Sequence, residues 1–258
     1  MEVHAEAFWL PKNGSSEAEY EDSFGPPTLK SPQSIKGERI RFAVTDGATE
    51  ASFSKQWAKQ IARGFVKGSL GVPLTAEELK PLQEEWQKTV HRRQLPWYAE
   101  EKAEKGAFSS LLGLEVFEAV NGEATALAWR AVAVGDSCLF QVDLGKVLKA
   151  WPIGNSADFG NTPSLLCSKA ANNGDGLAAA GVLKAEGGCG QGTAFYLMTD
   201  ALSCWFLREC EWGKEPWRIL TDLGTDEGQP FAKLVGDLRA ARDMKNDDVT
   251  LLRIDILG

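Results

Sequence analysis

Histidine is scarce in this 258-residue sequence, which contains only His4 and His91. A Ser-His-Asp or Cys-His catalytic system needs a histidine that the fold can place beside the nucleophile. His4 lies near the chain terminus, and His91 lies in a charged stretch with a helical pattern. Neither suits that role, so most histidine-dependent hydrolase mechanisms are disfavoured. If the protein is a hydrolase, the sequence favours a metal-activated water as its nucleophile.

Cysteines and long apolar runs are also too few to define a class. The five cysteines are an odd number without a Cys-x-x-Cys pair, so neither a disulfide framework nor a zinc cluster is indicated. No segment approaches the roughly 18 to 20 apolar residues that cross a bilayer, and the first residues lack the features of a signal peptide. The net charge of -8 argues against a nucleic-acid partner. We expect a soluble, cytoplasmic protein that binds neither membrane nor nucleic acid.

A short apolar run ends abruptly at an aspartate. Phe42, Ala43 and Val44 are typical of a buried strand, and Asp46-Gly47 follows at once. An Asp-Gly at a strand end brings a carboxylate and a closely approaching backbone carbonyl to one point. Oxygen ligands of this kind suit a hard cation such as Mg²⁺ or Mn²⁺. Taken alone, the same pair of residues is typical of an ordinary turn.

The remaining patterns predict an α+β protein with one domain spanning residues 1–258. Apolar residues at steps of four predict a helix over 52–66, and the capping box from Thr75 to Glu78 opens a second helix. Further helices are expected at 97–105, 203–209 and 231–242. Strands are expected at 7–10, as a sheet edge, and at 192–198 and 248–256. Four consecutive strands with short turns predict an antiparallel meander, at 110–120, 124–134, 137–142 and 147–151.

Acidic residues recur at the ends of the expected strands. They are Asp46, Asp136, Asp200 and Asp247. Each one singly is typical of a turn or a helix cap. If the fold brought them together without a cation, they would raise one another's pKa, and a divalent metal would relieve the repulsion. Their spacing in the sequence does not show whether they converge.

The order of six short motifs resembles the metal-dependent PP2C-type protein phosphatases of bacteria. The motifs cover nearly the whole chain, at 21–24 (EDSF), 42–47 (FAVTDG), 106–111 (GAFSSL), 134–137 (VGDS), 198–201 (MTDA) and 246–250 (NDDVT). No single motif is specific, whereas the six in this order and spacing are hard to obtain by chance. The resemblance implies a four-layer α-β-β-α sandwich, with two antiparallel sheets flanked by antiparallel helix pairs.

The resemblance also implies a centre of two Mn²⁺ or Mg²⁺ ions and a role for each matching residue. Asp46 would bridge the metals, the Gly47 carbonyl would bind one of them, and Asp200 and Asp247 would bind the other. Glu21 and Asp22 would act nearby through metal-bound water. A water bridging the metals would attack phosphorus, so the implied activity is the hydrolysis of phosphoserine and phosphothreonine in proteins by a monomeric signalling phosphatase.

The chain departs from the family pattern at several positions. Ala48 stands where many members have a histidine, although bacterial members often lack it. Cys204 replaces an expected aspartate, which weakens the case for a third metal, to which Asp136 would contribute. Asp248 stands where asparagine is usual. A phosphate-binding arginine expected near Glu17 is missing; Lys12 could replace it as a catalytic point charge or be an ordinary loop lysine.

Two alternatives to a protein phosphatase follow from these departures. The first is a weak or inactive PP2C-like binding module, and the second is a phosphatase of small phosphate esters. Other signals are weaker. The glycine-rich stretch 187–192 precedes an expected strand instead of opening a helix, so we interpret it as a turn. The acidic stretch 19–22, considered by composition alone, is typical of a solvated loop.

Overall fold

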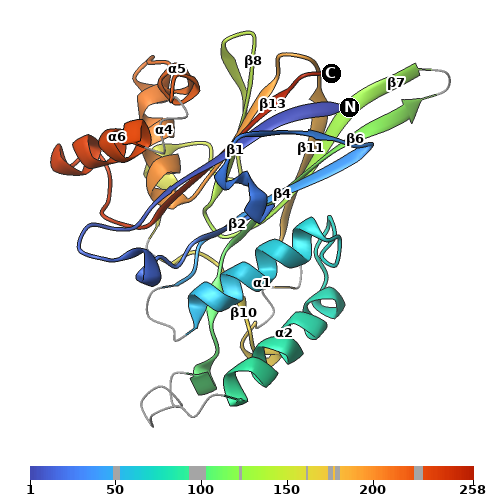
Figure 1. The fold of residues 1–258 in the computed structure, drawn as a ribbon, viewed down its shortest axis with the longest axis vertical. Coiled ribbons are helices and arrows are strands. Elements are labelled where there is room, and N and C mark those ends of the chain that lie inside the picture. The colour runs from blue at the N-terminus through green and yellow to red at the C-terminus, as the bar shows by residue number, and fades with distance from the viewer. Residues whose placement is uncertain are drawn as a thin grey trace.

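The computed structural model describes residues 1–48, 53–92, 103–121, 124–160, 162–173, 177, 181–223 and 229–258. Within these ranges two antiparallel sheets lie face to face with helices outside each (Figure 1). The six-stranded sheet has the order β3-β1-β13-β12-β8-β9. Its strands are β1 (Glu2–Leu10), β3 (Gln33–Lys36), β8 (Cys138–Asp143), β9 (Lys146–Trp151), β12 (Ala194–Met198) and β13 (Val249–Ile256).

The second sheet has five strands in the order β11-β7-β6-β4-β2. These strands are β2 (Ser23–Gly25), β4 (Arg39–Thr45), β6 (Leu111–Asn121), β7 (Ala124–Val134) and β11 (Leu183–Cys189). A small two-stranded ribbon joins β5 (Phe108–Ser109) to β10 (Leu166–Cys167). Short 3-10 helices are η1 (Glu17–Glu19), η2 (Pro27–Lys30), η3 (Ser156–Asp158) and η4 (Ala170–Asn172).

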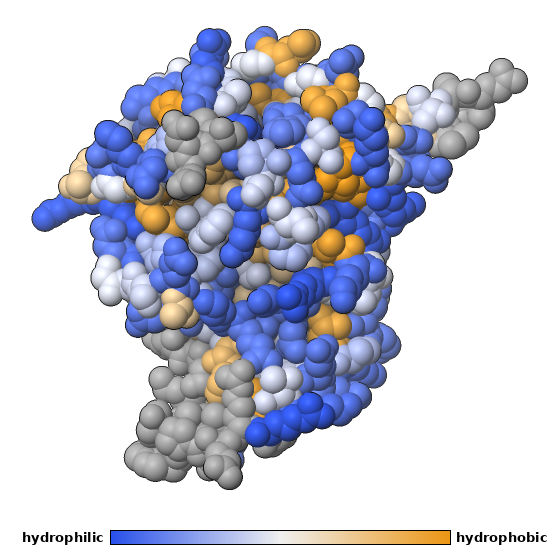
Figure 2. Space-filling view, viewed as in Figure 1, coloured by the Kyte–Doolittle hydropathy of each residue, from blue (hydrophilic) through white to orange (hydrophobic). Residues whose placement is uncertain are grey.

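The α-helices form the two outer layers. Helices α1 (Ser54–Val66) and α2 (Ala76–His91) cover the five-stranded sheet, whereas α4 (Asp200–Glu211), α5 (Pro216–Thr221) and α6 (Gln229–Ala240) cover the six-stranded sheet (Figure 1). The expected α-β-β-α sandwich is therefore confirmed. None of the helices in the described ranges has the length and apolar character of a membrane-spanning segment. The face seen in Figure 2 is largely hydrophilic, with its apolar residues in separate patches.

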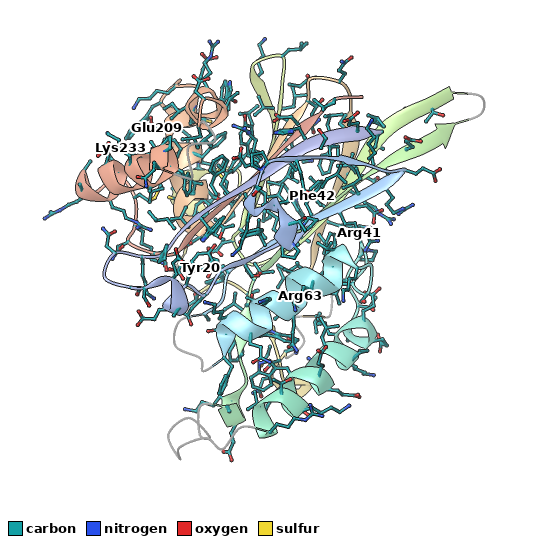
Figure 3. The ribbon with its side chains drawn as sticks, viewed as in Figure 1. Tyr20, Arg41, Phe42, Arg63, Glu209 and Lys233 are labelled. Carbon is teal, nitrogen blue, oxygen red and sulfur yellow. The ribbon has the colours of Figure 1, made fainter. Side chains whose placement is uncertain are left out.

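Alternation along the strands builds three apolar layers, because successive side chains point to opposite faces of a sheet. In β4, Phe42 and Val44 pack between the two sheets, while Ala43 packs toward α1. Figure 3 shows Phe42 in this central position and Arg41 on the side of α1. Arg41 Nη1 donates to the carbonyl oxygens of Phe65 and Leu70, at 3.2 and 2.9 Å, and so anchors the end of α1.

The two predicted long helices form as expected. In α1 the buried residues Trp57, Ile61 and Phe65 recur at steps of four and face the sheet. The capping box of α2 is present: Thr75 Oγ1 accepts from the amide of Glu78, and the Glu78 carboxylate accepts from the amide of Thr75 at 2.9 Å. These groups satisfy amides that the first turn of a helix leaves without partners.

Three other predictions need correction. Strand β1 is longer than the predicted 7–10: it pairs with β13 over Val3–Leu10 and with β3 over Glu2–Ala5, so residues 7–10 lie opposite β13 and beyond the part that β3 pairs with. The meander is interrupted, because β6 and β7 pair in one sheet whereas β8 and β9 pair in the other. The glycine-rich stretch is not all turn, since residues 187–189 belong to β11. The error in the meander concerns which strand pairs with which, and hydrophobic alternation does not specify the partner.

Two predictions lie partly outside the described residues. The helix expected at 97–105 is described only at 103–105, which is helical. The turn expected between β6 and β7 includes Gly122, which also lies outside the described residues. Helix α5 and the short strands β2 and β3 were not predicted, because each is too short to show a clear hydrophobic period.

Candidate metal centre

The strand register brings the predicted acidic residues to one edge of the sandwich. Ser23 at the start of β2 lies opposite Thr45 at the end of β4. Leu10 at the end of β1 lies opposite Val249 at the start of β13, and Met198 at the end of β12 pairs with Leu251. Asp22 and Asp46 therefore adjoin paired strand ends of the five-stranded sheet, and Asp200 and Asp247 adjoin strand ends of the six-stranded sheet.

Asp46 is tied to the connection between the sheets through Ser110. The Asp46 amide donates to Ser110 Oγ at 2.9 Å, and the Ser110 amide donates to the Asp46 carbonyl at 2.8 Å. Ser110 Oγ also lies 3.0 Å from Ser137 Oγ. Ser137 follows Asp136, in the segment where the chain passes from β7 to β8 and from one sheet to the other. This crossing, which the sequence did not predict, places Asp136 at the same edge.

Asp22 is held in the interior by a chain of hydroxyl groups. Thr250 Oγ1 donates to Asp22 Oδ2 at 2.8 Å and is itself hydrogen-bonded to the Tyr20 hydroxyl. Asp22, Tyr20 and Thr250 are all buried, so the interpretation of residues 19–22 as a solvated loop is wrong for Tyr20 and Asp22. Tyr20 lies beside the edge where β2 begins (Figure 3). Asp22 Oδ1 is buried and has no hydrogen-bond partner among the described residues.

Asp248 organises the backbone next to this edge. Its two carboxylate oxygens accept from the amides of Lys12, at 2.9 Å, and Glu21, at 2.7 Å. The side chain is buried, so its charge is turned toward these amides and away from solvent. A carboxylate with both oxygens bonded to backbone amides fixes two loops at once. Asp248 thus fixes the backbone of Lys12 and Glu21 beside the edge. The presence of aspartate where the family usually has asparagine does not predict this role.

Asp200 and Asp247 share a lysine. Lys245 Nζ lies 2.7 Å from Asp247 Oδ2 and 3.5 Å from Asp200 Oδ2. Asp200 is the first residue of α4 and Asp247 precedes β13, so the lysine joins two separate elements. The backbone of Asp247 is also fixed, since its carbonyl accepts from Nη2 of the buried Arg239 at 2.5 Å. The sequence does not predict this role of Lys245, because the reach of a flexible side chain has no sequence signature.

The carboxylates at this edge perturb one another. Burial raises the pKa of Asp46 well above its usual range, and the charges of Asp22, Asp200, Asp136 and Asp247 raise it further. Burial, followed by the charge of Asp200, raises the pKa of Asp136 to about 6. The pKa values of Asp22 and Asp200 are raised as well, chiefly by burial. These carboxylates therefore lie close enough to raise one another's pKa, and they repel one another when no cation is present.

Gly47 lies where a side chain cannot fit. A Cβ at this position would come within 2.7 Å of the Glu21 carbonyl oxygen and 3.2 Å of the Ser54 carbonyl carbon. Glu21 is held from the other side, because Ser54 Oγ donates to Glu21 Oε1 at 2.6 Å. The close approach brings the backbone of the Asp-Gly pair against the Glu21 segment, as an Asp-Gly at a strand end predicts.

The residues at this edge fit a hydrated divalent cation better than a closed metal cage. In the part of the chain that the structure describes, no three His, Cys, Asp or Glu side chains come close enough together to enclose an ion. Among the described residues, the acidic side chains at this edge offer oxygen ligands, one buried carboxylate oxygen of Asp22 has no hydrogen-bond partner, and the carboxylates raise one another's pKa. Mg²⁺ keeps several water ligands and uses one or two carboxylates, so this arrangement suits it.

The departures from the family pattern have structural counterparts. Lys12 Nζ lies 3.9 Å from Glu21 Oε2, which places its charge at the same edge. The Ala48 amide donates to the Phe108 carbonyl at 3.0 Å, and its methyl group supplies no proton donor. Cys204 Sγ contacts the Ser156 carbonyl at 3.7 Å, and burial raises its pKa, so it is neither charged nor a substitute for a carboxylate.

Comparison with known proteins identifies the fold. No protein-family model and no curated protein sequence matches the chain. Among solved structures, the serine/threonine phosphatase PstP/Ppp of Mycobacterium tuberculosis is 14% identical, with a TM-score of 0.57 and 100% of both chains covered. Stp1 of Staphylococcus aureus is 16% identical, with a TM-score of 0.57, and the match covers 98% of this chain and 95% of that one.

A third similar structure is PppA of Pseudomonas aeruginosa, at 13% identity, 99% coverage of both chains and a TM-score of 0.53. The catalytic domain of PstP, solved in complex with two manganese ions, matches at 16% identity over the full length of both chains, with a TM-score of 0.55. This chain therefore has the PP2C-like fold that the order of its motifs predicts. At these identities the similarity establishes the fold alone, and the activity depends on the residues at the acidic edge.

Proposed function

We propose that this chain is a metal-dependent phosphatase of phosphoserine and phosphothreonine in proteins, and that it uses Mn²⁺ or Mg²⁺. The observation that carries the proposal is the convergence of Asp22, Asp46, Asp136, Asp200 and Asp247 at one edge of a PP2C-like fold. Buried carboxylates that raise one another's pKa are costly to keep together. Their placement is explained if this edge binds divalent cations.

Each residue at the edge has a distinct task in this proposal. Asp46 and the Gly47 carbonyl would hold one cation, with Asp46 shared between two, and Asp200 and Asp247 would hold the other. Glu21 and Asp22 would accept hydrogen bonds from water at the centre. Two bound cations would supply the positive charge that a phosphoryl transition state requires and an acidified water. A third cation near Asp136 is less well supported, because Cys204 gives no carboxylate.

The surrounding residues orient these ligands. Ser110 fixes the backbone of Asp46, and Thr250 fixes the Asp22 carboxylate. Lys12 lies beside Glu21 and would attract the anionic substrate as a point charge, with less directional binding than an arginine.

The test is hydrolysis of an aryl phosphate with and without Mn²⁺. The wild type should turn over only with the metal, and Asp46→Asn should lose at least about a hundredfold in kcat, because one shared ligand is neutralised. Asp237→Asn, at an exposed carboxylate paired with Lys233, is the matched control and should keep wild-type activity. Turnover that is independent of metal, or unchanged in Asp46→Asn, would reject the proposal.

One observation favours a second candidate, a binding module without activity. Lys245 already supplies a positive charge to Asp200 and Asp247, so part of the acidic edge is neutralised without metal. A folded wild type that neither binds Mn²⁺ nor hydrolyses phosphate esters at millimolar metal would support this candidate. The two functions are thus separated by the same experiment.

A further inference from the structure

Lys245 reaches from the surface across two carboxylates that are less exposed than itself. Its side chain is 62% exposed, against 15% for Asp200 and 28% for Asp247. Its ammonium group lies 2.7 Å from one carboxylate and 3.5 Å from the other. Burial lowers the pKa of Lys245, but the hydrogen bond to Asp247 and the charges of both carboxylates outweigh it, so the pKa lies above its usual value.

The carboxylates cannot turn away from this position easily. Asp200 Oδ1 accepts from the amide of Ala201 at 2.7 Å, and Asp247 Oδ1 accepts from the amide of Asp248 at 3.0 Å. In each residue it is the second oxygen, Oδ2, that faces Lys245. The two oxygens that accept no backbone hydrogen bond among the described residues are therefore the two that the ammonium group contacts. The lysine is the more mobile partner, because most of its side chain is in solvent.

We propose that Lys245 is a built-in counter-ion that competes with a divalent cation for Asp200 and Asp247. A cation that binds these oxygens must displace the ammonium group, which then moves into solvent on its flexible stem. The site formed by Asp200 and Asp247 therefore binds Mn²⁺ more weakly than the site formed by Asp46 and the Gly47 carbonyl. Its occupancy follows the concentration of free metal. The inference rests on the proposed function only in assuming that Asp200 and Asp247 take a metal.

The competition has a consequence for the metal-free protein. With Lys245 in place, two of the converging carboxylates are already paired, which reduces the repulsion at the edge. The lysine thus offsets part of the repulsion between the carboxylates, and it opposes the binding of a cation to Asp200 and Asp247. Neutral and charged substitutions of Lys245 separate the effect of its charge from the effect of the shape of its side chain.

The test is a titration with Mn²⁺ in which free metal is measured by electron paramagnetic resonance, so that no activity is needed. Lys245→Met removes the charge and keeps the apolar stem, and Lys245→Gln is a second neutral variant. Both should tighten the weaker Mn²⁺ site by about five- to tenfold, the size expected when partly exposed ion pairs no longer compete. Lys245→Arg keeps the charge and should stay within about twofold of wild type. Lys233→Met, on α6 and paired with the exposed Asp237, is the matched control (Figure 3).

The outcomes separate this inference from the proposed function. Two Mn²⁺ ions bound with the same affinity in wild type and in Lys245→Met would overturn the inference and leave the phosphatase proposal standing. Weaker binding in the neutral variants, or tighter binding in Lys245→Arg, would overturn it too. If neither wild type nor Lys245→Met binds Mn²⁺ at millimolar concentration, the metal centre itself is rejected along with the inference.

Discussion

The hydroxyl of Thr250 allows a sharp test of how the acidic edge is built. Thr250 Oγ1 donates to Asp22 Oδ2 and is hydrogen-bonded to the Tyr20 hydroxyl. All three residues are buried, and the other oxygen of Asp22 has no partner among the described residues. Thr250→Val keeps the shape of the side chain but removes the hydroxyl. Asp22 would then lose its Thr250 bond, and Tyr20 would be left with an unbonded buried hydroxyl.

The magnitude follows from these lost partners. Each buried polar group left without a hydrogen bond costs about 1–3 kcal/mol, and two groups are affected here. Some relaxation will recover part of the cost, so we expect Thr250→Val to lose about 3 kcal/mol of unfolding free energy. The backbone bond from the Thr250 amide to Thr199 Oγ1, at 2.9 Å, does not depend on the hydroxyl and should persist.

Urea unfolding of the metal-free protein at constant pH measures this loss. Thr28→Val is the matched control, because Thr28 is exposed and its hydroxyl only accepts a bond from Gln33 at 2.8 Å. The control should change the unfolding free energy by less than about 0.5 kcal/mol. A loss below about 1 kcal/mol in Thr250→Val, with an unchanged m-value, would refute the view that this hydroxyl holds Asp22 in place.

Two further predictions concern packing and pH. Gly113→Ala would place a Cβ 2.5 Å from the Phe65 ring and should lower the free energy of unfolding in urea by about 1–3 kcal/mol. Gly188→Ala, with open space around it, is the control, and equal stabilities of the two variants would show that β6 and α1 are not in close contact. A carboxyl whose pKa is raised by folding destabilises the folded state when it ionises, so the metal-free protein should gain thermal stability as pH falls from 8 through about 6, the pKa of Asp136. Asp136→Asn should reduce that gain, and a stability that falls steadily over this range would contradict the expected repulsion.

The parts of the fold that were predictable are those set by local patterns. Trp57, Ile61 and Phe65 repeat at the helical period, and Thr75 and Glu78 form their capping box within one turn. Asp46 is predictable because it directly follows a buried strand, which ends at Thr45. These signals depend on neighbouring residues in the chain, so the sequence contains them in full.

The parts that were not predictable depend on distant partners. Gly135-Asp136-Ser137 resembles a hairpin turn, and only the pairing of β8 with β12 shows that the chain changes sheets there. Tyr20 lies in an acidic stretch typical of solvent, yet Thr250, which is 230 residues away, draws it into the interior. Lys245 was missed for a similar reason, since its contact with Asp200 depends on the meeting of α4 with the segment before β13. The order of the motifs predicts which acidic residues lie at the edge, but it does not predict the hydrogen bonds and ion pairs that position them.

The most direct test of the central claim is Mn²⁺-dependent release of phosphate from a phosphothreonine peptide, compared with a small aryl phosphate, in wild type and Asp46→Asn. We predict metal-dependent release from both substrates, a higher kcat/KM for the peptide, and loss of both activities in the variant. Hydrolysis of the aryl phosphate alone would redirect the assignment to small phosphate esters. Absence of release from both substrates in folded, Mn²⁺-loaded wild type would contradict the claim that this acidic edge is a phosphatase centre.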